Sequence, residues 1–126
     1  MRSACALALG AILMGCADSD EEVRMPEHAV LVYFDYGSKD LGPMFALEEK
    51  LEAAIIAEDV GEFDGNEVAV DGSDATFFMY GPDADKLFGV VRPILETAPF
   101  MRGAKVKLRY GPPADGVREV EVLLGS

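Results

Sequence analysis

Cysteine, histidine and tryptophan are scarce in this chain. Among its 126 residues there are two cysteines, one histidine and no tryptophan. Cys5 lies within an apolar N-terminal run and Cys16 follows that run, so residues 17–126 contain no thiol. The folded part must therefore be held together by packing rather than by disulfides. Zinc and redox-metal sites also lack their usual ligands.

Nucleophilic catalysis has few candidate side chains for the same reason. A Ser-His-Asp arrangement would have to combine His28 with Ser38, Ser73 or Ser126, and none of these serines lies in a nucleophile-elbow pattern. Carboxylates are numerous, so any two can lie close together by chance. We therefore expect a protein that is not an enzyme and that uses no cofactor.

Positive charge is in deficit. The chain has 11 Lys and Arg against 23 Asp and Glu, which gives a net charge of −12 at pH 7. Residues 16–85 carry 19 acids against three bases, whereas residues 86–126 carry seven bases against four acids. An overall negative charge disfavours contact with a phosphate backbone. We therefore expect no nucleic-acid partner.

The N-terminal apolar run is too short to cross a bilayer. It extends over eleven residues, Ala4 to Met14, after a short basic start. A spanning helix needs about 20 residues, so this run is typical of a signal peptide. It ends in Leu13-Met14-Gly15-Cys16, which resembles the lipobox of bacterial lipoproteins. The resemblance covers the first sixteen residues, and Met14 departs from the small residue usual at its position.

The lipobox resemblance implies where the protein resides. In that family the signal peptide, here residues 1–15, is removed. Cys16 then receives a diacylglyceryl group on sulfur and often an acyl chain such as palmitate on its new amine. Two or more acyl chains anchor a protein stably, and the acidic residues 16–27 would form a flexible tether. Ala17 in place of Asp favours the periplasmic face of the outer membrane in a Gram-negative organism.

Residues 28–126 have the pattern of a single α+β domain. Strands are expected at 28–36, 67–70, 75–80, 103–111 and 117–124, with helices starting at Pro43 and at Gly81-Pro82. Turns are expected at Asp64-Gly65 and at 71–74. The order β-α-β-β-α-β with one further strand favours a ferredoxin-like split βαβ fold. With strands counted along the chain, the expected sheet order is 5-4-1-3-2.

Two segments of the body also resemble a known group of proteins. Gly61-Glu-Phe-Asp-Gly-Asn-Glu67 and Tyr80-Gly-Pro-Asp-Ala-Asp85 look like stretches of small uncharacterised bacterial proteins with a ferredoxin-like fold. This resemblance supports the fold class and implies no function.

The two acid-rich turns offer oxygen ligands for calcium. The candidate ligands are Asp64, Asn66, Glu67, Asp71 and Asp74. Calcium takes about six to eight oxygens in a set array, and the spacing here does not match an EF-hand loop. Turns favour Asp, Asn and Gly for backbone reasons alone. We therefore expect no metal, and calcium or small-ligand sensing through these turns is the alternative function.

The sheet face away from the helices is the candidate partner-binding surface. If Val30, Val32 and Phe34 face the helices, then Leu31, Tyr33 and Asp35 lie on the open side. The alternating pattern of residues 103–111 places three bases together on one side of the next strand: Lys105, Lys107 and Arg109. For residues 75–80 the pattern does not decide whether Phe77 and Met79 or Thr76, Phe78 and Tyr80 face outward.

In the last hairpin, glutamates are expected to neutralise the positive charge of these bases. Its register places Lys107 opposite Glu121 and Arg109 opposite Glu119, which weakens the positive field that a nucleic acid would need. The sequence thus predicts a lipid-anchored cell-envelope domain that is non-catalytic and binds a protein or a small ligand. The expected partner is an envelope protein or a second copy of the chain.

The lipobox can be tested by substitution. We expect Cys16→Ser to abolish membrane association, because the apolar run alone is too short to span. The matched variant Cys5→Ser should partition like the wild type, since Cys5 would leave with the signal peptide. Partitioning into a detergent phase measures both variants. Unchanged partitioning of the Cys16→Ser protein would contradict the lipid anchor.

Overall fold

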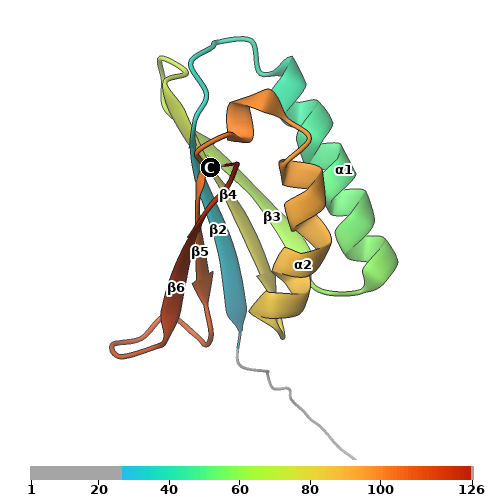
Figure 1. Ribbon diagram of the computed structural model, residues 1–126, viewed down its shortest axis with the longest axis vertical. Helices are drawn as coiled ribbons and strands as arrows, with labels where there is room; N and C mark the ends of the chain where they lie inside the picture. The colour runs from blue at the N-terminus through green and yellow to red at the C-terminus, as the bar shows by residue number, and fades with distance from the viewer. Residues whose placement is uncertain (1–26, 126) are drawn as a thin grey trace, which may run out of the picture.

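The computed structural model describes residues 27–125. They form an antiparallel sheet of five strands with two helices on one face (Figure 1). This is an α+β architecture, as expected, and it is compatible with a ferredoxin-like fold. The expected signal peptide, lipobox and most of the expected tether lie outside the described residues.

The strands follow one another across the sheet in the order β3-β4-β2-β5-β6. Their bounds are β2 His28–Asp35, β3 Glu62–Val68, β4 Asp74–Gly81, β5 Lys105–Arg109 and β6 Glu119–Leu123. The helices are α1 Gly42–Glu58 and α2 Ala84–Leu95, followed by the short 3-10 helix η1 Pro99–Met101. Read from the β6 edge, each strand has the neighbours predicted from the sequence. Within residues 27–125, no helix combines the length and apolar character that crossing a membrane requires.

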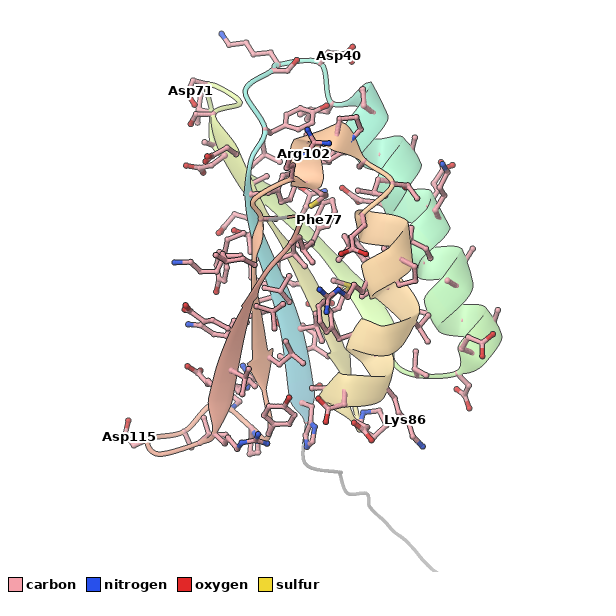
Figure 2. All side chains as sticks on the ribbon, viewed as in Figure 1. Asp40, Asp71, Phe77, Lys86, Arg102 and Asp115 are labelled. Carbon is pink, nitrogen blue, oxygen red and sulfur yellow. The ribbon has the colours of Figure 1, made fainter. Side chains whose placement is uncertain are left out.

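Alternation along the central strands builds the core, with Ala29 beside Val30 as the exception on β2. Val30 and Val32 of β2 are fully buried against the helices. On β4 the buried residues are Ala75, Phe77 and Met79, which decides the alternative that the sequence left open. Figure 2 shows Phe77 between the sheet and the helices. The other face of β4 therefore carries Thr76, Phe78 and Tyr80.

Both helices bury one stripe against the sheet. Along α1 the buried residues recur at the three- and four-residue spacing of a helix face, and they are Met44, Leu47, Leu51 and Ile55. Along α2 they are Ala84, Leu87, Phe88, Val91 and Leu95. Pro93 lies inside α2 and has no amide to donate, and the helix ends two residues later at Leu95.

The strand β3 differs from its prediction. Asp64-Gly65 was expected to be a turn and the strand to begin at Glu67, but β3 runs unbroken from Glu62 to Val68. The register shifts between Phe63 and Gly65, and Gly65 has a φ of 114°. The glycine thus allows a bulge rather than a turn. Phe63 then reaches the core, where its ring centroid lies 5.4 Å from that of Phe77.

The start of α2 is tied to the start of β2. Gly81 was expected to open this helix, but it belongs to β4, and Asp83 caps the helix by accepting from the amide of Asp85 at 3.0 Å. His28 adds a second cap, because its Nδ1 accepts from the amide of Ala84 at 3.0 Å. Helix N-termini leave such amides without partners, so both caps stabilise this junction.

Gly72 and Gly116 both have a positive φ, but only Gly72 lies close to another backbone segment, so substituting each of them tests that contact. Gly72 and Gly116 have φ of 76° and 80°. A Cβ at Gly72 would lie 2.1 Å from the carbonyl oxygen of Ser38, whereas a Cβ at Gly116 would meet nothing within 4 Å. We expect Gly116→Ala to lower the free energy of unfolding by about 1–2 kcal/mol. Gly72→Ala should lower it by clearly more in urea unfolding, and equal losses would contradict the packing of these loops.

Candidate functional site

The sheet face opposite the helices has no described segment lying on it, and we call it the open face (Figure 2). Its residues follow from the strand register. They are Glu62 and Glu67 of β3, Asp74, Thr76, Phe78 and Tyr80 of β4, Ala29, Leu31, Tyr33 and Asp35 of β2, Lys105, Lys107 and Arg109 of β5, and Glu119, Glu121 and Leu123 of β6. All five predicted partner-binding residues lie on it.

The centre of the open face is apolar and aromatic. Leu31 lies opposite Phe78, and Tyr33 lies opposite Thr76. Tyr33 remains 37% exposed, and at the β6 edge Leu123 is 56% exposed. An antiparallel sheet with one solvated face usually carries polar residues there. Here the two middle strands carry a nearly continuous apolar strip instead.

The strand β5 adds a row of bases that is only partly compensated. The expected pairing of Lys107 with Glu121 and of Arg109 with Glu119 is confirmed by the register. The ion pair, however, is diagonal, with Lys107 Nζ lying 3.8 Å from Glu119 Oε1. The same Nζ lies 6.0 Å from the centre of the Tyr33 ring. Arg109 Nε donates instead to the carbonyl oxygen of Gly111 at 2.7 Å.

The strand β3 gives the other side of the open face an acidic border. Glu62 lies opposite Tyr80, and Glu67 lies opposite Thr76. Burial raises the pKa of Tyr80, and the nearby Asp64 carboxylate raises it further. The Tyr80 hydroxyl therefore stays protonated at neutral pH and can donate a hydrogen bond. From β3 to β6 the face is acidic, apolar, basic and then acidic again.

The five candidate calcium ligands are not brought together. Asn66 lies on the helix side of the sheet, where its Nδ2 donates to Glu48 Oε2 of α1 at 2.5 Å. Its neighbour Glu67 lies on the open face. Asp71 sits in the turn, where hydrogen bonds from the Ser73 hydroxyl and amide lower its pKa. Asp64 lies at the bulge, and Asp74 begins β4. In the described part of the chain, no three His, Cys, Asp or Glu residues are grouped so as to hold a metal ion.

A polar cluster lies where β2 and α2 begin. The Tyr110 hydroxyl donates to Asp85 Oδ1 at 2.6 Å, and this bond raises the pKa of Tyr110. The Arg118 guanidinium stacks over the same ring at 4.4 Å, and the ring of His28 meets it edge-on at 5.7 Å. Every polar group named here contacts another within the cluster or the cap on α2. The arrangement joins β2, α2 and the segments that follow β5.

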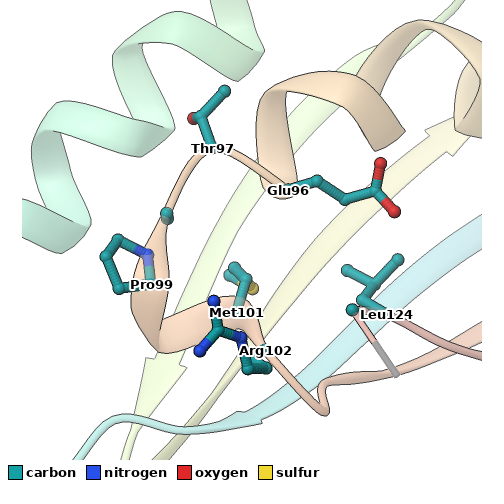
Figure 3. A pocket seen from close by; sticks show the side chains of 8 residues that line it. Glu96, Thr97, Pro99, Met101, Arg102 and Leu124 are labelled. Atoms are coloured by element: carbon teal, nitrogen blue, oxygen red, sulfur yellow. The ribbon is translucent and has the colours of Figure 1, made fainter.

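A pocket of 340 Å³ lies at the end of α2 (Figure 3). Glu96, Thr97, Pro99 and Arg102 form its rim, and the buried Met101 and Leu124 also line it. The Glu96 carboxylate already pairs with Arg92 Nε at 3.3 Å. No polar side chain of residues 27–125 is fully buried, so the polar residues that line this pocket are all in contact with solvent. The pocket is a weaker candidate than the open face.

Comparison of the chain with protein-family models, with curated proteins and with solved structures gives no match in any of the three. Its function must be argued from its own surfaces. Sequence reasoning did not include Phe78 and Tyr80 in the candidate site, because it left the face of their strand undecided. It also missed Glu62, which lay outside the predicted strand. The pairing of β2 with β4 was the signal that could have placed the two aromatic residues.

The separation of the acidic side chains predicts the response to calcium. We expect the same melting temperature in calcium and in EDTA, because no described cluster supplies a calcium shell. Magnesium at equal concentration is the control, since any divalent cation screens a protein of this negative charge. A rise in melting temperature that calcium causes and magnesium does not would favour the sensing function.

Proposed function

We propose that this protein is a lipid-anchored cell-envelope domain that binds another protein through its open face. The observation that carries the proposal is the apolar strip at the centre of that face. Leu31, Tyr33, Phe78 and Tyr80 lie side by side on β2 and β4, with no described segment above them. A contiguous apolar patch on a soluble surface marks an interaction site, and tyrosine is enriched in protein interfaces.

The fold we propose for the domain is ferredoxin-like. In that topology the first and third strands lie side by side at the centre of the sheet, and β2 and β4 do so here. Both helices connect strands across the same face, which leaves the other face for partners. The additional strand β6 widens the open face beyond the four strands of the basic arrangement.

The lipid anchor is supported by the sequence Leu13-Met14-Gly15-Cys16. From Cys16 to His28 there are twelve residues. Such a chain can span at most about 40 Å, so the domain would be held close to the membrane surface. A partner would therefore be met in or near the envelope.

The charges on the open face favour a protein over a nucleic acid. Aromatic residues beside bases resemble the sheet of an RNA-recognition domain. Here, however, Lys107 is paired with Glu119, and acids border the face on both β3 and β6. The net charge of −12 adds long-range repulsion from phosphates.

Replacement of Tyr33 tests the proposed face directly. We expect Tyr33→Glu to abolish chemical cross-linking of the membrane-bound protein to its partner, because it places a charge in the apolar strip. The control is Ile56→Glu, since Ile56 is 69% exposed on the far side of the molecule, on α1. Circular dichroism should show both variants folded. Cross-linking that survives Tyr33→Glu, or is lost equally in both variants, would refute the proposed face.

A further inference from the structure

We propose that the partner on the open face is a second copy of this chain. The two copies would pack face to face about a two-fold axis that runs parallel to the strands, midway between β2 and β4. This inference rests on the proposed function of the open face and specifies its occupant. The order of charges across the sheet supports it.

The acidic and basic strands lie at equal distances from the proposed axis. Neighbouring strands are about 4.8 Å apart, so β3 and β5 each lie about 7 Å from the midline, on opposite sides. Rotation about the axis places β3 of each copy over β5 of the other, and β2 over β4. The apolar strips then meet at the centre, and acids meet bases on both flanks.

The register gives the individual contacts. Glu62, Tyr80, Ala29 and Arg109 lie in one row across the sheet, whereas Glu67, Thr76, Tyr33 and Lys105 lie in another. Rotation about an axis parallel to the strands places each row of one copy over the same row of the other copy. Glu67 of each copy therefore faces Lys105 of the other, and Glu62 faces Arg109. At the end of the apolar strip, Asp35 of each copy faces Asp74 of the other, so two like-charge contacts accompany the four attractive ones. Long side chains can accommodate the rotation of about 30° that sheet twist imposes on aligned packing.

Two other symmetric arrangements oppose like charges and lack the acid–base contacts of β3 with β5. An axis along β2 itself would place β3 over β6, so that Glu62 met Glu119 and Asp35 met its own copy, while Glu67 met Leu123. An axis across the strands would place each strand over its own copy, so that bases met bases on β5. Edge-to-edge pairing is disfavoured because β3 has a bulge and acidic residues, and β6 carries two glutamates.

The distribution of charge also directs association to the open face. Residues 27–125 contain 19 acids and nine bases, a net charge of −10. By register the open face carries six of those acids, the four glutamates of β3 and β6 together with Asp35 and Asp74, and three of those bases, a net charge of −3. Most of the repulsion between copies therefore comes from elsewhere, including α1 with Glu48, Glu49, Glu52 and Glu58 against Lys50. Face-to-face packing keeps the two α1 helices on the outside.

The proposed interface is small, and attachment of both copies to one membrane would compensate for its weakness. Four overlapping strands of about seven residues cover roughly 450 Å² per copy in plan. The total is near 900 Å², below the roughly 1,200 Å² of a stable complex, so the pair would be weak in dilute solution. An axis parallel to the strands leaves both β2 starts at one end, so both tethers can reach one membrane. Confinement there raises the effective concentration of each copy for the other.

Charge reversal in the full-length protein, in its own membrane, tests this arrangement. Zero-length carbodiimide cross-linking between carboxylates and amines should trap a wild-type dimer. Glu67→Lys and Lys105→Glu should each lose the dimer, because each places like charges in both symmetric contacts. Lys50→Glu makes the same charge change on α1, so it is the control and should keep the dimer.

Combining the two charge reversals shows whether the partner is a second copy or another protein. The double variant Glu67→Lys/Lys105→Glu should dimerise again, and so should a mixture of the two single variants carrying different tags. Dimerisation of the single variants at the wild-type level, or failure of both restorations, would overturn the inference. Loss of all cross-linked adducts in Tyr33→Glu, with the charge variants unchanged, would leave the proposed function standing and refute only the second copy. Adducts that survive Tyr33→Glu would refute both.

Discussion

In the middle of the sheet, eight residues of β2 pair with eight of β4, from His28 opposite Gly81 to Asp35 opposite Asp74. This register decides which side chains share a face. It places Val30 and Val32 with Phe77 and Met79 against the helices, and it leaves the apolar strip on the other side. A slip by one residue would exchange the two faces. The core and the open face are therefore two results of the same pairing.

Local patterns were sufficient to predict much of this fold. The apolar alternation of residues 28–36 and the helical spacing after Pro43 gave β2 and α1 nearly to the residue. The register of β5 with β6 also followed from the sequence, because Val106 and Leu108 must share a face with Val120 and Val122. The strand neighbours then followed from the order of elements along the chain.

Contacts between distant residues could not be predicted in the same way. Gly65 looks like a turn residue, and only the pairing of β3 with β4 shows that its positive φ forms a bulge. Asn66 bonds Glu48 across 18 positions, and His28 bonds Ala84 across 56. The diagonal pair of Lys107 with Glu119 depends on side-chain conformations that register alone does not determine. Only the β2 half of the apolar strip could be predicted. The alternation along β2 assigns Leu31 and Tyr33 to one face, whereas β4 is apolar on both faces and its pattern assigns neither.

The proposed function predicts that the open face is covered when the protein is in its membrane. Acylation of lysines in isolated membranes measures this most directly, with the dilute soluble Cys16→Ser protein as the uncovered reference. Lys105 and Lys107 lie on the open face, whereas Lys50 and Lys86 lie on the two helices. The proposal predicts that the first two lysines react more slowly in membranes than in the soluble protein, while the helical lysines react equally in both. Equal reactivity of all four lysines in the two preparations would contradict it.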